Sequence, residues 1–210
     1  MNTEIEYNVI VATDKNGGFG ANGVLPWNIP LELKYFKWVT SLSKEAKNFV
    51  VMGRKTWDSI PEKFRPLIGR INIVFTQDEK FIEENIVKEG IFYAVSNVSQ
   101  FEDVIKQYKV MKSELFVIGG FQILKLFEQC YPNRCKMIFH SLVMKRYEQC
   151  DVFYEIPEGF SLLSEYVLYC DKEETNYSLR ILGNEIMELD NIEALEECYI
   201  KEFLAHLKRI

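Results

Sequence analysis

The sequence lacks the features that mark several large classes of protein. Basic residues are not in excess, because 25 Lys and Arg stand against 31 Asp and Glu, for a net charge of −6. Phosphate contacts need a basic patch, so this balance disfavours a nucleic-acid partner. The longest apolar stretch, LFVIGGFQILKLF at 115–127, is too short and too interrupted to cross a membrane. The first residues, MNTEIE, carry acids where a secretory signal would carry bases.

Metal-ligating residues are also scarce. The chain has 2 His and 5 Cys, and no two cysteines show the C-x-x-C spacing of a zinc site. We therefore expect no metal, and we interpret the cysteines as reduced core thiols of a cytoplasmic protein. No internal repeat or low-complexity segment interrupts the chain. With 210 residues, 48% of them hydrophobic, it can bury a sizeable core without disulfides.

Short runs rich in Val and Ile, bounded by polar residues, predict strands. These runs lie at 7–13, 49–53, 71–75, 91–95, 115–118 and 136–144. Their apolar residues are often consecutive, which is typical of a parallel sheet covered by helices on both faces. Apolar residues at helical spacing lie between them, at 31–42, 99–111 and 121–130. The alternation predicts an α/β fold in a single domain with a mostly parallel central sheet and flanking helices.

The last part of the chain departs from this alternation. Residues 160–170 and 177–182 are extended runs joined by the polar DKEETN, which predicts an antiparallel hairpin. Glu and Leu then dominate, and apolar residues recur every three or four positions through 185–207. This spacing predicts an amphipathic helix capped near Asp190 or Asn191.

We therefore divide the chain into a domain at 1–183 and a C-terminal helical extension at 184–210. In one interpretation the helix packs on its own domain, and in the other it contacts a subunit or a partner.

The segment GFGANG at 18–23 matches the G-x-G-x-x-G pattern of dinucleotide-binding loops. Such a loop needs a helix that begins at its third glycine, but VLPWNIP follows Gly23. Pro26 and Pro30 cannot both lie inside that helix. We therefore interpret 18–23 as a glycine-rich mobile loop that closes over a ligand, and not as a Rossmann loop.

Several ordered motifs run between residues 7 and 182. They are VIVA at 9–12, NGVLPWNIP at 22–30, an acid within LELKYFK, VMGRKTWDSIP at 51–61, RPLIGRINIV at 65–74 and VIGG at 117–120. Together they resemble the dihydrofolate reductase family. The resemblance implies that family's fold and hydride transfer from NADPH to dihydrofolate, giving tetrahydrofolate for one-carbon and thymidylate metabolism. It also implies that antifolate inhibitors bind.

Glu32 lies near the start of a predicted helix, among large apolar residues on its own turn. A single Glu on a helix more often faces solvent, but the resemblance implies that Glu32 is the catalytic acid. A carboxylate there can accept hydrogen bonds from the ring N–H and amino group of the pterin. Burial would raise its pKa, and the group would then assist protonation of the pterin ring nitrogen through a water.

The resemblance implies substrate contacts at further positions. Arg70 matches the position that pairs with the α-carboxylate of the glutamate tail, for which a forked guanidinium is suited. Ser141 aligns with the threonine that lies near the acid in the family. Apolar walls and the entrance of the site are implied for Leu33, Phe36, Ile60, Phe64 and Leu67.

Arg54, Lys55 and Thr56 follow one predicted strand and begin a helix, where N–H groups and basic side chains suit phosphate. The resemblance implies that they bind the cofactor phosphates, including the 2′-phosphate of NADPH. The family holds the pair matching Gly119 and Gly120 in a cis peptide against the cofactor. Further cofactor contacts are implied for Ala12, Phe19, Gly20, Gly23, Leu25, Trp27, Thr76, Gln77, Ile118, Phe121, Gln122 and Ile123.

The sequence departs from the family pattern in places. Leu124 stands where the family usually has an aromatic residue, and Gln77 lacks the charge of an arginine found in some relatives. NADPH preference would therefore depend on Arg54 and Lys55. The alternatives are a related pterin or pyrimidine reductase and a non-catalytic folate- or nucleotide-binding module. We expect a monomer, and 210 residues do not hold the thymidylate synthase domain to which some relatives are fused.

Overall fold

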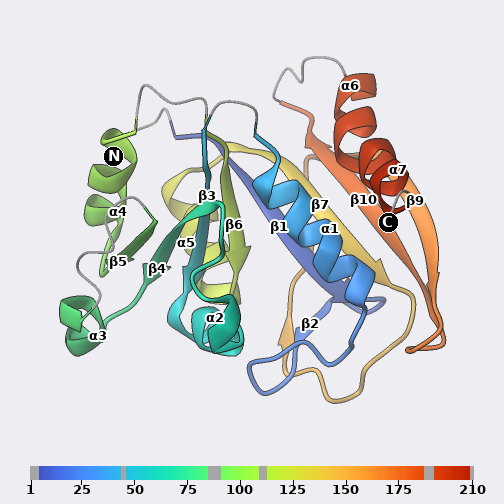
Figure 1. Cartoon of the computed structure of the whole chain (residues 1–210), viewed down its shortest axis with the longest axis horizontal. Helices are drawn as coiled ribbons and strands as arrows, with labels where there is room; N and C mark the ends of the chain where they lie inside the picture. Colours follow the sequence, from blue (N-terminus) through green and yellow to red (C-terminus); the bar gives the residue numbers. More distant parts are fainter. Residues whose placement is uncertain (1–4, 44–45, 85–90, 109–112, 187–191, 209–210) are drawn as a thin grey trace. The chain divides into compact units, whose positions relative to one another are not determined.

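The computed structural model describes residues 5–43, 46–84, 91–108, 113–186 and 192–208 (Figure 1). Contacts within the chain divide it into two compact units. The first unit comprises Met1–Asn8 and Thr40–Arg134, and the second comprises Val9–Val39 and Cys135–Ile210. Strands from both units follow one order in an eight-stranded sheet, β5-β4-β3-β6-β1-β7-β10-β9.

Within its described residues, the first unit holds parallel strands and four helices. Strand β3 is parallel to β4 and β6, and β4 is parallel to β5. The strands are β3 (Asn48–Gly53), β4 (Arg70–Phe75), β5 (Phe92–Val95) and β6 (Leu115–Gly119). The helices are α2 (Arg54–Ser59), α3 (Glu79–Glu84), α4 (Val98–Lys106) and α5 (Phe121–Cys130), with a 3-10 turn, η1 (Glu62–Phe64).

Local chemistry explains these elements. Phe49, Val50, Val51 and Met52 of β3 are all at most 4% exposed, as expected for a strand that is covered on both faces. Helix α4 begins where the Asn97 side chain accepts a hydrogen bond from the backbone N–H of Gln100, an N-cap that satisfies one free donor. The core of the first unit also contains the rings of Phe75, Phe101 and Phe127, which pack on one another in tilted and edge-on pairs.

The second unit holds the antiparallel part of the sheet. Strand β10 (Thr175–Asn184) pairs in antiparallel fashion with β7 (Cys135–Val143) on one side and β9 (Phe160–Cys170) on the other. Most of β1 (Tyr7–Asp14) and of α1 (Pro30–Ser41) belongs to this unit. The short strands β2 (Gly18–Gly20) and β8 (Val152–Phe153) form a separate antiparallel pair.

The C-terminal helical segment lies beside α1 in the second unit (Figure 1). It consists of α6 (Ile192–Glu196), a π-helical turn η2 (Glu197–Lys201) and α7 (Glu202–Leu207). Tyr199, Ile200 and Phe203 are buried, so the segment packs on its own chain. The cap predicted near Asp190 or Asn191 lies outside the described residues. Ile186, which belongs to the predicted apolar stripe, is 72% exposed in a turn before the segment.

The predicted fold class is confirmed: strands and helices alternate, the sheet is mostly parallel, and an antiparallel hairpin precedes a C-terminal helix. The predicted helix at 99–111 ends earlier, at Lys106, and 109–111 lie outside the described residues. Strands β2 and β8, the turn η1 and helix α3 were not predicted, because segments this short show no periodicity. The structure also has no helix at Gly23. Helix α1 begins only at Pro30, a residue well suited to the first helical position.

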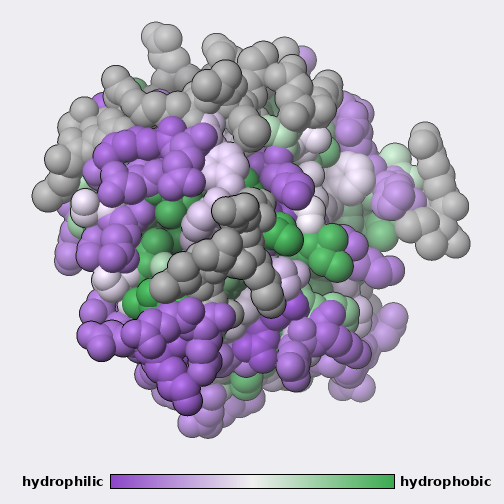
Figure 2. Space-filling view, turned by 60° about the vertical axis from the view of Figure 1, so that its left-hand side comes forward, coloured by the Kyte–Doolittle hydropathy of each residue, from purple (hydrophilic) through white to green (hydrophobic). Residues whose placement is uncertain are grey.

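The surface, the helices and the cysteines can be compared with what the composition predicts. Figure 2 shows one face on which hydrophilic side chains predominate and hydrophobic ones form small patches. Among the described residues, none of the helices has the length and hydropathy needed to cross a membrane. All five cysteines are free thiols, but only Cys135 and Cys170 are buried, so the others are not core residues.

Candidate active site

A buried acid lies in the second unit. Glu32 occupies the first turn of α1 and is only 6% exposed, although Leu33 beside it is 55% exposed. The Ser141 hydroxyl on β7 donates a hydrogen bond to Glu32 Oε1 over 3.2 Å. Burial raises the pKa of Glu32 from an ordinary 4.5 to about 7, and the Ser141 hydrogen bond opposes this rise. The carboxyl group therefore exchanges its proton close to neutral pH.

The charge of Glu32 acts on two buried tyrosines. Burial raises the pKa of Tyr35 on α1 and of Tyr177 on β10, and the charge of Glu32 adds to both rises. Both hydroxyl groups are buried and have no hydrogen-bond partner among the described residues, and the same holds for the indole N–H of Trp27. A buried donor without a partner costs about 1–3 kcal/mol, so such groups are suited to a ligand or water that completes them.

The glycine-rich loop of the second unit is tied by two aspartates. The buried Asp14 carboxylate accepts hydrogen bonds from the backbone N–H groups of Asn16, Gly18 and Tyr147. Asp151 accepts one from Asn22 N–H, and its own N–H donates to the Gly20 carbonyl. These contacts join the loop to residues 147–151. Neither aspartate was identified from the sequence, because nothing in its local pattern marks it.

The other predicted residues of the second unit lie around this loop, on β1 and on α1. Ala12 is buried on β1, Trp27 packs against Tyr147 with ring centroids 5.3 Å apart, and Phe36 on α1 is half-buried. The remaining loop positions are Phe19, half-buried and 6.0 Å from the Tyr154 ring, Gly20 in β2, Gly23 in a turn with φ of 81°, and Leu25, 38% exposed.

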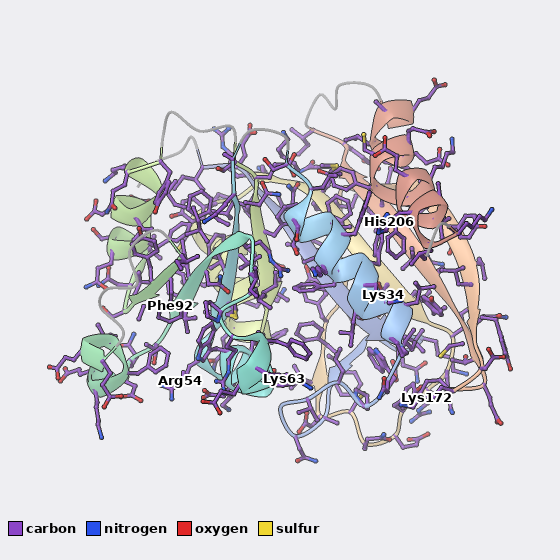
Figure 3. The ribbon with its side chains drawn as sticks, viewed as in Figure 1. Lys34, Arg54, Lys63, Phe92, Lys172 and His206 are labelled. Atoms are coloured by element: carbon purple, nitrogen blue, oxygen red, sulfur yellow. The ribbon has the colours of Figure 1, made fainter. Side chains whose placement is uncertain are left out.

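In the first unit, the residues predicted to bind phosphate begin α2, and one of them, Arg54, forms ion pairs with two aspartates. Arg54 extends from the start of α2 (Figure 3). Its Nε lies 2.8 Å from Asp58 Oδ2, and its Nη1 lies 3.0 Å from Asp78 Oδ2. The guanidinium also stacks 3.8 Å from the centre of the Phe81 ring. Sequence reasoning missed both acids, although Asp58 follows Arg54 at the i,i+4 spacing of helical ion pairs. Lys55 is exposed beside Arg54.

The peptide between Gly119 and Gly120 is cis, as the resemblance implied, and it separates β6 from α5. A Cβ atom added to Gly120 would lie 3.3 Å from Thr56 Oγ1. One added to Gly53 would lie 3.1 Å from Ile123 Cγ1. The starts of α2 and α5 therefore approach closely, and a side chain at either glycine would have to displace its neighbour by a few tenths of an ångström. The first N–H groups of a helix have no partner within the helix. This cradle fits the phosphates of a dinucleotide.

The neighbouring predicted cofactor residues occupy the same ends of the strands. Thr76 is buried after β4, and its hydroxyl accepts a hydrogen bond from the backbone N–H of Asp78. The Gln77 amide donates to the Ser96 carbonyl over 2.7 Å. The others are Ile118, half-buried at the end of β6, and Phe121, Gln122 and Ile123 in the first turn of α5, of which only Ile123 is buried.

Arg70 begins β4 and is 3% exposed. Its Nη1 donates to Thr40 Oγ1 over 2.8 Å and its Nε to the Ile68 carbonyl over 3.2 Å. Burial lowers the pKa of the guanidinium to about 10, so Arg70 stays positively charged at neutral pH. The predicted apolar residues of this unit are Leu67, which is buried, Ile60, which is half-buried, and Phe64, which is 55% exposed.

Comparisons with known proteins show the family to which the chain belongs. A family model described as dihydrofolate reductase matches residues 6–182. A dihydrofolate reductase of Heliothis virescens is 36% identical over 159 residues, which cover 72% of this chain and 80% of that protein. One of Pneumocystis carinii is 38% identical over 165 residues, covering 74% of this chain and 77% of that protein. The chain belongs to the dihydrofolate reductase family.

The names of other relatives include a second enzyme, thymidylate synthase. A bifunctional dihydrofolate reductase-thymidylate synthase of Glycine max is 35% identical over 180 residues, which cover 83% of this chain. This chain spans about a third of the length of such bifunctional relatives. The family match ends at residue 182, so the C-terminal helical segment lies beyond it.

Proposed function

We propose that this chain reduces 7,8-dihydrofolate to 5,6,7,8-tetrahydrofolate with NADPH. The observation that carries the proposal is the buried carboxyl group of Glu32, whose pKa is raised to about 7, in a chain of this family. A general acid works best when its pKa lies near the working pH, since it then holds a proton and can release it. An exposed Glu would be ionised at neutral pH and could not serve in this way.

Each residue of the site would have a distinct task. NADPH, when bound, supplies the hydride. Glu32 would accept hydrogen bonds from the pterin and assist proton delivery to the ring nitrogen, and Ser141 would fix the orientation of its carboxyl group. Arg70 would pair with the carboxylate of the glutamate tail, and its buried setting would strengthen that pair. The surrounding apolar side chains would exclude water from the reacting atoms.

The cofactor phosphates would bind at the starts of α2 and α5. Arg54, Lys55 and Thr56 offer charge and donors, while Gly119 and Gly120 allow close approach of the backbone. We propose that preference for NADPH over NADH rests on Arg54 and Lys55. Because Arg54 contacts Asp58 and Asp78, a 2′-phosphate would have to compete with two carboxylates for it. We therefore expect a weaker preference for NADPH than a free arginine would provide.

The direct test follows the absorbance of NADPH, and then of NADH, after addition of dihydrofolate to the purified chain. Oxidation of NADPH that depends on both enzyme and dihydrofolate is the expected result. Glu32→Gln should retain cofactor binding and lose most turnover at neutral pH, since an amide cannot deliver the proton. If dihydrofolate causes no oxidation while another reduced pterin or a pyrimidine does, the substrate assignment is wrong. If no heterocycle is reduced, the chain is a binding module.

A further inference from the structure

The C-terminal segment, which we define as residues 192–207, belongs to the hydrophobic core of the second unit. Three of its side chains are buried: Tyr199 is 5% exposed, Ile200 is 1% exposed and Phe203 is 2% exposed. The segment nevertheless lies beyond the residues that match the family. Its packing is therefore a property of this chain, and the elements that it touches show what it could do.

One group of contacts joins the segment to α1. The Phe203 ring lies 5.2 Å from the Tyr35 ring and 6.0 Å from the Trp38 ring, centroid to centroid. Trp38 Nε1 donates to the Cys198 carbonyl over 3.1 Å. His206, labelled on α7 in Figure 3, has its ring 5.5 Å from the Trp38 ring. Such ring pairs stabilise a contact beyond the apolar area that they bury. The segment and α1 are thus held together by rings and a hydrogen bond.

A second contact joins the segment to β7. The Tyr199 ring packs edge-on against Phe139, with centroids 4.7 Å apart, and Phe139 is fully buried. Because side chains alternate along a strand, Phe139 lies on the same face of β7 as Ser141. On α1, Tyr35 follows Glu32 by three positions and so lies on neighbouring surface of the helix. The two contacts of the segment therefore lie next to the two partners of the Ser141–Glu32 hydrogen bond.

We propose that the C-terminal segment clamps α1 onto β7 and thereby holds Glu32 buried against Ser141, with Tyr199 and Phe203 as positioning residues. The proposal concerns the second unit alone. Its catalytic meaning rests on the proposed function, in which Glu32 is the acid. Phe203 acts through Tyr35, and Tyr199 acts through Phe139, so neither needs to contact the substrate.

The clamp makes a prediction about the proton on Glu32. A smaller side chain at position 203 would let α1 move from β7 and admit water, which removes part of the cost of burying the charge. The pKa of Glu32 would then fall toward 4.5. The groups that face Glu32 are the hydroxyl groups of Ser141 on β7, Tyr35 on α1 and Tyr177 on β10. The raised pKa values of Tyr35 and Tyr177 keep both tyrosines uncharged near neutral pH. None of these groups carries a charge that could keep the pKa of Glu32 high once water enters.

The experiment compares Phe203→Leu with Phe101→Leu, the same substitution at a fully buried ring of the first unit. The titration of Glu32 is read from its carboxyl infrared band, as the difference between each protein and its Glu32→Gln counterpart. We expect the midpoint to fall by about one pH unit in Phe203→Leu and to stay unchanged in Phe101→Leu. Equal midpoints in the parent chain and Phe203→Leu would overturn the clamp.

Activity provides a second readout and separates this proposal from the proposed function. Above the midpoint, turnover of dihydrofolate should drop about tenfold for each pH unit that the pKa falls. If the parent chain does not reduce dihydrofolate, the proposed function fails, but the infrared titration still decides on the clamp. If Phe203→Leu does not fold, Trp38→Phe is measured in the same way. It removes the hydrogen bond to Cys198 and shortens the ring beside Phe203 and His206. A lower midpoint supports the clamp, and an unchanged one refutes it.

Discussion

Replacing Glu32 with glutamine should make the protein more stable at alkaline pH while removing most of its activity. The pKa of Glu32 is raised by burial from 4.5 to about 7, so the folded chain binds this proton more tightly than the unfolded chain. The contribution of Glu32 to stability is therefore complete below pH 4.5. It is lost as the pH rises through about 7, where the ionised carboxylate remains buried. Glutamine has the same shape and carries no charge at any pH.

The size of the effect follows from the two pKa values. A change from 4.5 to about 7 corresponds to about 3 kcal/mol, at ~1.4 kcal/mol for each pH unit. Between pH 5 and pH 8, the stability of Glu32→Gln relative to the parent chain should rise by about 2–3 kcal/mol. In urea, this shift corresponds to a midpoint about 1 M higher or more.

Urea unfolding at pH 5 and pH 8, followed by tryptophan fluorescence, measures this difference. The matched control is Glu158→Gln, which removes an exposed carboxylate and should leave the pH dependence unchanged. Turnover of dihydrofolate is measured on the same samples, because a buried charge that costs stability is expected where function requires it. The reasoning is refuted if Glu32→Gln and the parent chain lose stability in parallel between the two pH values.

Three further predictions concern the partners of the site. Ser141→Ala removes the hydrogen bond that lowers the pKa of Glu32, so the alkaline limb of the kcat profile should move to higher pH; a limb at or below that of the parent chain would contradict this. Asp78→Asn should remove one of the two carboxylates that compete for Arg54 and lower the KM for NADPH about two- to fivefold, the range of exposed ion pairs, with the KM for NADH as the internal control. Equal changes for both cofactors would refute it. Arg70→Lys should raise the KM for dihydrofolate about tenfold or more through loss of the forked contact, with the KM for NADPH unchanged.

Much of the fold followed from local patterns. The strand predicted at 49–53 was recognisable because its apolar residues are consecutive, and the helix predicted at 31–42 because its apolar residues recur at helical spacing. The two-residue strand β8 and the turn η1 left no such signal. In the candidate site, Glu32 was identified from its apolar neighbours and the family resemblance. The two aspartates that contact Arg54 were not identified from the sequence, and one of them, Asp78, lies 24 positions away along the chain.

The sequence by itself determined the family, the α/β class and the kinds of residue available for catalysis, because these depend on motifs and on periodicity within a few turns. Only the tertiary structure decided the state of those residues. The pKa of Glu32 depends on burial and on Ser141, 109 positions away, and the C-terminal segment reaches Trp38 across 160 positions. Such contacts depend on which faces of distant elements meet, and desolvation arises only when they do.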